Sequence, residues 1–371
     1  MTHDRRKRPE RRARAALGWC LLMFITSQAA LDAALDGWPE IRDPEFGSKL
    51  ARLRSQLDGA GERPLILILG SSRSEVGIDP QVFDAPPNEG SPEPIVFNFA
   101  MTGAGPIQQS MLLTELLARR IVPAKVLVEL HPLFLNQRAG ALREETRIDV
   151  RRLGWSRMTV LCGYSQNPGF LRRNWWRCRM TPWYVYRQQL LDMCWPGWCT
   201  QPGQYRLYRH VGPSGWLPFT VSDRGEEARR ERLEKARLEY QQALSDFRVT
   251  SEPDRALREL FDLCGERQIA VGVYLMPEAS QFRDWYPPGL RSMVDDYLHR
   301  LQEEYAFDVF DFSTSVDDES FADGHHLLSE AAAAFSARFG REVIAATPAD
   351  RTSQPSQRTA NRWLPTKAAT K

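Results

Sequence analysis

The sequence predicts an α/β protein built on a doubly wound parallel sheet, with an N-terminal transmembrane helix and an insertion rich in Trp and Cys. Five apolar runs of strand length lie in two parts of the chain, 60–140 and 251–345. Segments with helical periodicity separate most of them, and the interval 141–250 does not follow this alternation. Strands that alternate with helices are typical of a parallel sheet covered on both faces.

The first predicted strand is the run Leu-Ile-Leu-Ile-Leu at 65–69, which ends at Gly70. A continuous apolar run is typical of a strand that is buried on both faces. The same pattern predicts four more strands, at 94–99, 125–130, 269–275 and 308–311.

Apolar residues at helical spacing predict the helices between and after these strands. The predicted helices lie at 106–120, 253–267, 288–305 and 327–344. They follow or precede the strands closely, as expected for short connections in such a sheet.

The interval 141–250 holds seven of the chain's 11 tryptophans and most of its cysteines, and it ends in an amphipathic helix at 225–247. We interpret it as an insertion or cap on the sheet domain. Two interpretations of its aromatic side chains remain open, a surface facing the membrane or substrate and a disulfide-stapled subdomain with an aromatic core; the second is favoured. The tryptophans are Trp155, Trp175, Trp176, Trp183, Trp195, Trp198 and Trp216.

The N-terminus has the composition of an export signal. Residues 1–14 are strongly basic and run directly into an apolar stretch at 15–35. This pattern predicts a signal anchor, with a cleaved signal peptide as the alternative because Ser27-Gln28-Ala29 offers small residues. Positive flanks stay in the cytoplasm, so the sequence predicts a single-pass protein of a bacterial inner membrane, with its soluble domain on the periplasmic side.

The net charge of +2 conceals basic ends and an acidic body. The tail at 346–371 is basic and rich in Pro, Ser and Thr, which predicts disorder. Because the folded body has no basic excess, we expect no nucleic-acid partner.

Four of the six cysteines lie close together in the insertion, at Cys162, Cys178, Cys194 and Cys199. In an exported chain this clustering predicts at least one disulfide among them, of unspecified pairing. A zinc site is the less favoured alternative, because the cluster has no Cys-x-x-Cys pair and no histidine.

Polar motifs with catalytic potential follow three of the predicted strands. Gly70-Ser71-Ser72 follows the first, Asn98 to Gly103 the second, and Asp323-Gly324-His325-His326 the fifth. The carboxyl ends of parallel strands meet at one edge of a sheet, where such folds place their sites. A serine, a histidine and a carboxylate together are the parts of a nucleophilic triad.

At these motifs the chain resembles the SGNH (GDSL-like) hydrolase superfamily, and the resemblance implies a flavodoxin-like SGNH fold. It implies Ser72 as nucleophile, His326 as its base and Asp323 as the partner of that histidine. It also implies an oxyanion hole from the backbone N–H groups of Ser72 and Gly103.

One block departs from the family pattern. The Gly-x-Asn-Asp expected after the third strand is replaced by Glu129-Leu130-His131-Pro132. This resembles the envelope branch with the D-alanyl-lipoteichoic-acid biosynthesis protein and the alginate-type O-acetyltransferases. It implies an ester hydrolase or O-acyltransferase that uses an acyl donor and acts on an envelope polysaccharide or another exported ester. A membrane-bound biosynthetic partner is a further implication of the resemblance. The alternative is a non-catalytic module of the same fold that binds carbohydrate or a biosynthetic partner.

Several residues near the motifs have alternative interpretations. Ser71 is a second candidate nucleophile, and the Ser71-Ser72 pair alternatively only caps a helix. His325-His326 is a weak metal candidate, because adjacent residues are expected to point apart. We predict no metal and no cofactor, since the sequence has neither GxxxxGK[ST] nor GxGxxG after a strand. The candidate substrate-binding residues are Arg73, Asn98, His131 and Glu278.

Overall fold

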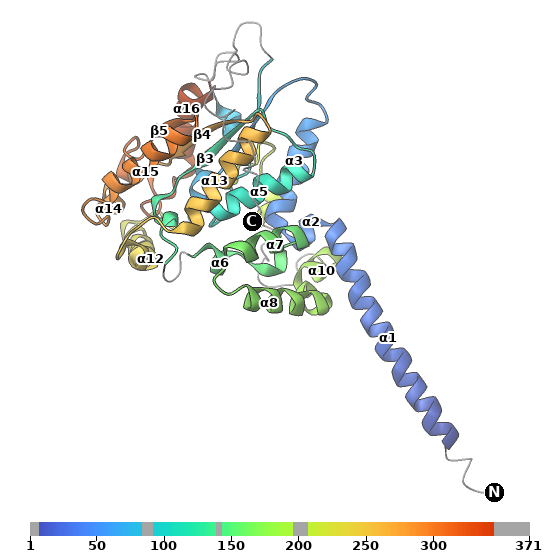
Figure 1. Ribbon diagram of the computed structural model, residues 1–371. Coiled ribbons are helices and arrows are strands. Elements are labelled where there is room, and N and C mark those ends of the chain that lie inside the picture. Colours follow the sequence, from blue (N-terminus) through green and yellow to red (C-terminus); the bar gives the residue numbers. More distant parts are fainter. Residues whose placement is uncertain (1–6, 84–91, 139–142, 196–206, 345–371) are drawn as a thin grey trace, which may run out of the picture.

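A five-stranded parallel sheet forms the centre of the protein in the computed structural model, which describes residues 7–83, 92–138, 143–195 and 207–344 (Figure 1). The strand order is β2-β1-β3-β4-β5, and every neighbouring pair is parallel. This is the order of flavodoxin-like doubly wound sheets. All five predicted strands are confirmed to within a residue or two: β1 (Leu65–Leu69), β2 (Ile95–Asn98), β3 (Lys125–Glu129), β4 (Ala270–Leu275) and β5 (Asp308–Asp311).

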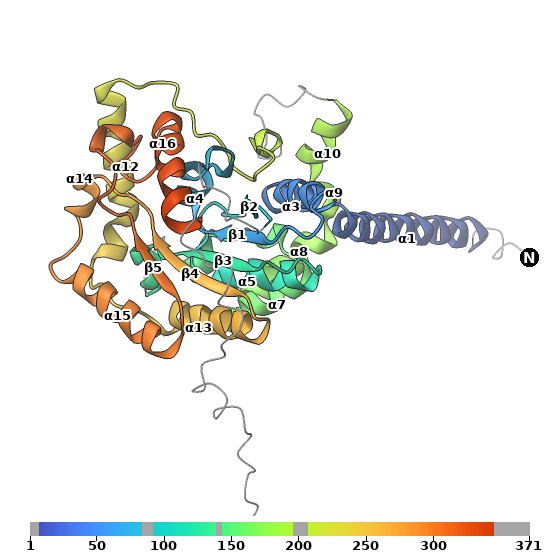
Figure 2. The ribbon, with the colours of Figure 1, turned by 90° about the horizontal axis from the view of Figure 1, so that it is seen from above.

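Helices cover both faces of this sheet (Figure 2). Because side chains alternate along a strand, Leu67 and Leu69 of β1 enter one core and Ile66 and Ile68 enter the other. The larger core is closed by α3 (Pro44–Leu57), α5 (Pro106–Ala118), α13 (Ser251–Glu266) and α15 (Leu290–Glu304). The smaller core is closed by α16 (Ser329–Phe339), which also packs on α4 (Ser72–Gly77).

The first helix, α1 (Lys7–Gly37), projects away from the body (Figure 1). Its part from Arg11 to Gly37 is long and apolar enough to cross a membrane, and only 11% of the tested window is buried. The predicted span at 15–35 lies inside this helix. Only its last turns meet the body, where Leu31 and Leu35 pack with Ile41 of α2 (Pro39–Arg42).

The residues of the insertion that the structure describes, 143–195 and 207–250, form helices and irregular segments without a strand. Its helices are α6 (Glu144–Arg147), α7 (Trp155–Tyr164), α8 (Pro168–Met180), α9 (Pro182–Val185), α10 (Arg187–Cys194) and α12 (Glu226–Leu244). Short elements complete the described chain: α14 (Ser280–Arg283), the 3₁₀ helices η1 (Pro80–Val82), η2 (Pro132–Leu135), η4 (Val150–Arg152), η5 (Tyr208–His210) and η6 (Asp318–Ser320), and the π turn η7 (Gly340–Ile344).

Two interpretations of the insertion are wrong for the residues that the structure describes. The favoured aromatic core is absent there, because Trp155, Trp176, Trp183 and Trp195 are at least half exposed and only Trp175 is fully buried. The expected disulfide is also absent among Cys162, Cys178 and Cys194, which are held on three separate helices with free thiols. Trp198, Cys199 and the tail at 346–371 lie outside the described residues.

Candidate active site

The site begins at the carboxyl end of β1, beside the switch point between β1 and β3. Ser71 is the N-cap of α4, and its Oγ accepts the backbone N–H of Arg73 at 3.2 Å. Ser72 is therefore the first residue of α4, a position whose N–H has no partner within the helix. It is partly exposed while Gly70, Ser71 and Arg73 around it are buried.

Ser72, His326 and Asp323 form a continuous chain of hydrogen bonds. Ser72 Oγ lies 2.8 Å from His326 Nε2, across 254 residues of sequence. His326 Nδ1 lies 2.8 Å from Asp323 Oδ2, and Asp323 Oδ1 accepts the backbone N–H of His326 at 2.9 Å. A serine, an imidazole and a carboxylate in this order have the geometry of a nucleophilic triad. The structure thus brings together the three residues that the sequence motifs suggested.

A tight loop holds the last two of these residues. Ala322 donates its N–H to His326 O at 2.9 Å, and Gly324 between them has a φ of +90°, which favours glycine. Burial alone would raise the pKa of Asp323, but the two neighbouring histidines and the hydrogen bonds from His326 hold it well below its usual value. The carboxyl group therefore stays ionised at neutral pH, as the partner of an imidazolium requires.

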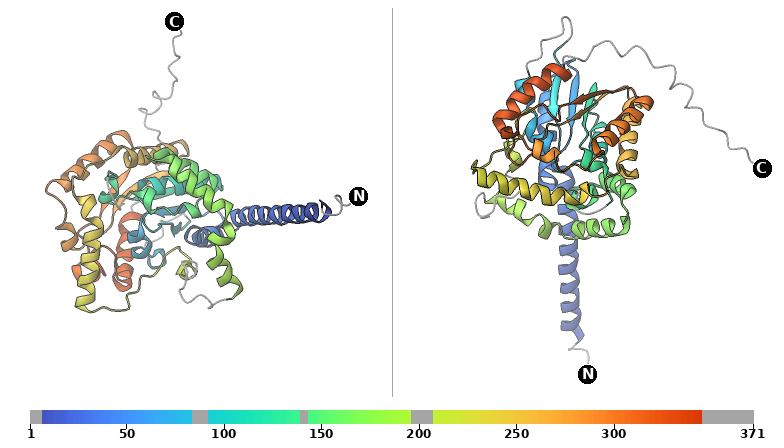
Figure 3. Two further views of the ribbon diagram at one scale, coloured as in Figure 1. Left: turned by 90° about the horizontal axis from the view of Figure 1, so that it is seen from below. Right: turned by 90° about the vertical axis from the view of Figure 1, so that its left-hand side faces the viewer.

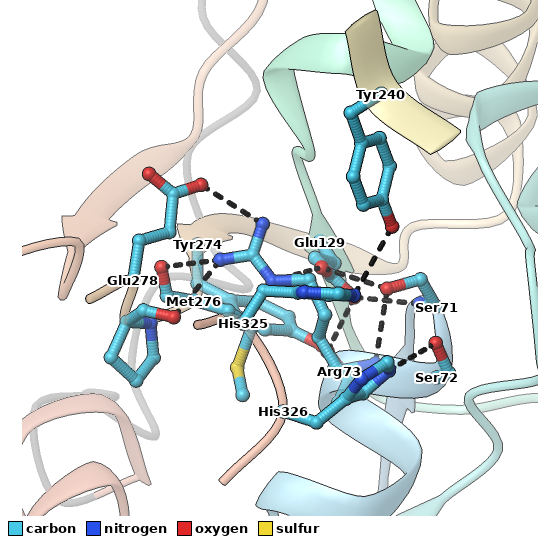
Figure 4. A network of polar contacts seen from close by, with 12 residues as sticks. Ser71, Ser72, Arg73, Glu129, Tyr240, Tyr274, Met276, Glu278, His325 and His326 are labelled. Atoms are coloured by element: carbon cyan, nitrogen blue, oxygen red, sulfur yellow. Dashed lines mark hydrogen bonds and ion pairs between the residues drawn. The ribbon is translucent and has the colours of Figure 1, made fainter. Parts of the chain in front are cut away.

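His325 points toward the same carboxylate as His326, so the expectation that these adjacent histidines point apart is wrong. Their ring centroids are 4.1 Å apart (Figure 4). His325 Nδ1 lies 3.2 Å from Asp323 Oδ1. Burial and the nearby His326 lower the pKa of His325 to about 3, which makes it a neutral imidazole.

The ligand atoms of Asp323, His325 and His326 all lie within 4.8 Å of one another, close enough to hold one metal ion. Binding an ion there would break the contact between Asp323 and His326 Nδ1, because both are potential ligands. The geometry therefore allows Asp323 and His326 to act either in the triad or, with His325, as ligands of one metal ion.

Glu129 at the end of β3 fixes the turn that carries the serine, and sequence reasoning missed it. Its fully buried carboxylate accepts the N–H of Ser71 at 2.6 Å, the Ser71 hydroxyl at 3.0 Å and the Ser74 hydroxyl at 2.6 Å. A Cβ at Gly70 would lie 2.5 Å from Glu129 Oε2, so only glycine fits there. The Ser71 hydroxyl is thus committed to Glu129 while Ser72 faces His326, which distinguishes the two candidate nucleophiles.

Arg73 and Glu278 form a buried ion pair of 3.0 Å behind the nucleophile turn (Figure 4). Arg73 also donates to Met276 O at 2.8 Å and lies 3.9 Å from Glu129. Burial alone would lower the pKa of Arg73, but Glu278 and Glu129 together raise it, so the guanidinium is charged. Both Arg73 and Glu278, two of the predicted substrate-binding residues, are at most 2% exposed and are paired with each other.

Asn98 and His131, the other two predicted substrate-binding residues, are also buried. Asn98 Nδ2 donates to Ser74 O at 2.8 Å and to Ile78 O at 2.7 Å, which ties β2 to the middle and to the C-cap of α4. His131 packs edge-on against Phe134 and at a tilt against Tyr240, and neither ring nitrogen has a hydrogen-bond partner among the described residues. Burial lowers the pKa of His131 well below its usual value, so it is an uncharged packing residue.

The Gly103 turn lies beside the nucleophile turn, as the family resemblance implies. Met101 N–H donates to Gly70 O at 2.9 Å, and Thr102 Oγ1 donates to Glu75 Oε2 of α4 at 2.9 Å. Gly103 has a φ of +73° in a turn closed by Ala104 N–H to Met101 O at 3.0 Å. The positive φ explains the glycine and sets the direction of its N–H.

Two aromatic residues of the insertion complete the site, and sequence reasoning did not assign them to it. The Phe219 ring packs on the His326 ring with centroids 5.6 Å apart, and Ser329 Oγ holds Phe219 O at 2.7 Å. Tyr240 of α12 places its hydroxyl 3.3 Å from His325 Nε2. At Gly215 the insertion passes close to the end of β2, because an added Cβ there would lie 2.2 Å from Asn98 O.

A cavity of about 380 Å³ lies on the other side of the Met101–Thr102 turn. Its walls are mainly hydrogen-bonding side chains, among them Thr102, Gln108, Arg147, Arg152, Gln188 and Tyr208. Arginine and acidic side chains alternate around it, as in the 3.1 Å pair of Arg152 with Glu45. Such a lining suits a polar ligand with many hydroxyl groups.

No protein-family model matches this chain, and no curated protein matches it either. The chemistry is therefore inferred from the geometry above.

Proposed function

We propose that this protein is a serine ester hydrolase or O-acyltransferase of the SGNH type, with Ser72 as nucleophile, His326 as base and Asp323 as the carboxylate that orients it. The observation that carries the proposal is the contact of 2.8 Å between Ser72 Oγ and His326 Nε2, continued by the 2.8 Å contact to Asp323. A serine hydroxyl needs such a base to become nucleophilic near neutral pH.

The reaction starts when Ser72 Oγ attacks the acyl carbonyl carbon and His326 Nε2 takes the hydroxyl proton. Collapse of the tetrahedral intermediate breaks the ester bond, and the imidazolium returns its proton to the departing alcohol oxygen. The acyl group stays on Ser72. Water or an acceptor hydroxyl then attacks this acyl-enzyme, with His326 again moving the proton, so the same residues support hydrolysis and transfer.

The developing oxyanion is placed against two backbone donors, the N–H groups of Ser72 and Gly103. Ser72 N–H stands at the N-terminus of α4, and the Gly103 turn is tied to the neighbouring loop by Met101 and Thr102. A donor of this kind typically contributes about 3 kcal/mol to the stabilisation of the transition state.

The SGNH assignment is supported by the positions of the motifs in the sheet. The nucleophile follows β1, the glycine turn follows β2, and the Asp-His loop follows β5, in a sheet of order 2-1-3-4-5. The departure in the third block has a structural counterpart: at the end of β3, Glu129 supports the turn that carries Ser72. The third block thus supports the turn that carries Ser72 instead of donating a hydrogen bond to the substrate.

We further propose that α1 anchors the protein in a bacterial inner membrane, with the body on the periplasmic side, where it uses an acyl donor and acts on an envelope polysaccharide. The length and apolarity of α1 and the basic residues before it support this. The polar cavity beside the Gly103 turn suits the glycan, and a membrane-bound biosynthetic partner fits the same location. Reporter fusions after Lys371 test the topology, since a cytoplasmic signal there would contradict it.

Labelling with a serine-reactive fluorophosphonate tests the chemistry. The full-length protein is incubated with the probe as wild type, as Ser72→Ala and as the matched control Ser71→Ala. We expect labelling of the wild type, slower but persistent labelling of Ser71→Ala, whose hydroxyl only supports the turn, and loss of labelling in Ser72→Ala. No labelling of a folded wild-type protein would favour the non-catalytic binding module instead.

A further inference from the structure

The chain from residue 150 to residue 191 has an unusual composition for a surface that faces water. It contains no Asp or Glu, and its arginines are Arg151, Arg152, Arg157, Arg172, Arg173, Arg177, Arg179 and Arg187. Aromatic side chains lie between them. Arginine mixed with tryptophan and tyrosine is typical of segments that lie at a membrane–water interface.

Apart from Trp155 of α7, the exposed large apolar side chains of this segment lie on α8 and α9. They are Phe170, Trp176, Met180, Trp183 and Tyr184, which are 54%, 50%, 60%, 50% and 68% exposed. Trp176 and Met180 are four residues apart and share one side of α8, and Trp183 and Tyr184 follow on α9. Arg172, Arg173 and Arg177 flank them and form no ion pair with another described residue. We call these eight side chains the α8–α9 face.

The α8 helix and the short α9 after it lie at the end of the body from which α1 projects (Figures 1 and 3). Arg179 of α8 binds both Asp32 and Asp36 of α1, each at 2.8 Å. The N–H of Trp183 donates to Gln28 Oε1 of α1 at 3.4 Å. These contacts fix the position of the α8–α9 face along the axis of α1.

The part of α1 that the body leaves free is too short for the whole body to lie outside a bilayer. The body covers α1 from about Gln28 onward, and the last basic residue before the apolar stretch is Arg14. At 1.5 Å per residue the free helix from Ala15 to Ser27 is about 20 Å long. The hydrocarbon core of a bilayer is about 30 Å thick. If Arg14 stays at the cytoplasmic surface, the opposite surface lies beside the part of α1 that already contacts α8 and α9.

We propose that the α8–α9 face is embedded in the interfacial layer of the bilayer that α1 crosses, with its aromatic rings among the headgroups and its arginines on lipid phosphates. This inference rests on the proposed anchoring role of α1 and not on the chemistry of Ser72. The partner is an anionic phospholipid surface. Its phosphates match a segment that is rich in Arg and lacks acidic residues, and the two-point attachment holds the site at a constant height above the membrane.

Depth-dependent quenching tests this on the full-length protein in liposomes of phosphatidylcholine and phosphatidylglycerol. A fluorescent amino acid is placed at one position per sample: 176 or 183 on the α8–α9 face, 24 on α1, and 293 on α15, where Met293 is 40% exposed. Lipids brominated near the headgroup end of their acyl chains are the quencher. We expect quenching at 176 and 183, weaker quenching by this lipid at 24, and none at 293.

The labelled positions distinguish a failure of the embedded α8–α9 face from a failure of the α1 anchor. Quenching at 24 by lipids brominated deep in the chain, with 176 and 183 as unquenched as 293, would overturn the embedded face and leave the anchor intact. No quenching at 24 by either lipid would overturn the anchor and the face together, while fluorophosphonate labelling of Ser72 would be unaffected. A thermal melt of each sample identifies misfolded protein.

A substitution of one arginine tests the contribution of positive charge to membrane contact. Arg173→Gln is expected to reduce quenching at 183 in liposomes with phosphatidylglycerol and to leave it unchanged in pure phosphatidylcholine. The matched control is Arg300→Gln, an exposed arginine on α15. Equal effects of the two substitutions would contradict a specific contact between the α8–α9 face and lipid phosphate.

Discussion

Tyr240 and His325 are joined by a contact of 3.3 Å between the phenolic hydroxyl and Nε2, which connects the insertion to the triad. Burial raises the pKa of Tyr240, so its hydroxyl keeps its proton and donates it. Nε2 of His325 is then the acceptor and the ring proton sits on Nδ1, which lies 3.2 Å from Asp323 Oδ1 without the geometry of a hydrogen bond. Asp323 thus lies between two imidazoles, one that contacts Ser72 and one held by Tyr240.

Tyr240→Phe is expected to lower kcat about 2- to 10-fold with little effect on KM for a p-nitrophenyl acetate surrogate. The loss corresponds to one hydrogen bond of about 0.5–1.5 kcal/mol, removed from a residue that acts through Asp323. Because His325 is then free to change tautomer, the pH profile of kcat should shift as well. An unchanged profile in a folded variant would assign Tyr240 to packing alone. Leu238→Ala, an exposed position on the same helix, is the matched control.

Glu129→Gln is expected to destabilise the protein by about 1–3 kcal/mol, the range for lost hydrogen bonds to a charged group. The amide keeps one oxygen acceptor where the carboxylate has two for Ser71 and Ser74, and it leaves Arg73 with Glu278 as its only carboxylate partner among the described residues. Urea unfolding measures the change. Activity should fall too, because the turn that presents Ser72 loses its support. The exposed control Glu303→Gln should change neither quantity, and equal unfolding midpoints for the two variants would contradict the role of Glu129.

The strands were predictable because a buried parallel strand needs a run of apolar residues, and Leu65–Leu69 is such a run. The triad was predictable because each member follows a strand, where the sheet brings distant loops together. Glu129 was not, because nothing in the sequence distinguishes a buried carboxylate at a strand end from an exposed one. Its role depends on two serines that are 55 and 58 residues away in the sequence.

In the insertion, predictions made from composition alone were wrong for the described residues. Clustered cysteines predicted a disulfide, but helices α7, α8 and α10 hold Cys162, Cys178 and Cys194 separately. Tryptophan content predicted a core, whereas most of the described tryptophans are exposed. Composition gives the residue types of a helix but not the face that its neighbours cover. That face is decided here by contacts with α1, such as the ion pair between Arg179 and Asp36.

Stability should fall as pH rises from about 4.5 to about 8, because Glu45 is protonated only in the folded state. Burial, and then the nearby charge of Glu75, raises the pKa of Glu45 to about 8, against an ordinary value of 4.5. Between these values the folded protein binds the proton and the unfolded chain does not, so the free energy of unfolding decreases with pH. Each unit of pKa difference corresponds to about 1.4 kcal/mol.

Glu45→Gln tests this assignment, since glutamine keeps an oxygen for the N–H of Thr102 and does not titrate. Urea unfolding near pH 5 and near pH 8 should give a smaller difference for the variant than for the wild type. Part of the slope should remain, because burial also raises the pKa of Glu144 to about 7. Identical slopes for both proteins would remove Glu45 as a source of the pH dependence.

Asp323→Asn separates an orienting carboxylate from a simple structural loop residue. Asparagine can keep Oδ1, which accepts the backbone N–H groups of His325 at 3.2 Å and His326 at 2.9 Å, so the loop should remain folded. The other oxygen becomes an amide that donates toward His326 Nδ1, which favours the tautomer with its proton on Nε2 and removes the negative charge beside the imidazolium. By analogy with the serine-protease triad, kcat should then fall by about 10⁴-fold. Turnover of p-nitrophenyl acetate by wild type, Asp323→Asn and His326→Ala measures it, with thermal melts as the folding control. A loss nearer 10-fold would indicate a Ser72–His326 dyad in which Asp323 contributes little. Full activity in Asp323→Asn would remove Asp323 from the mechanism, and full activity in His326→Ala would end the triad proposal.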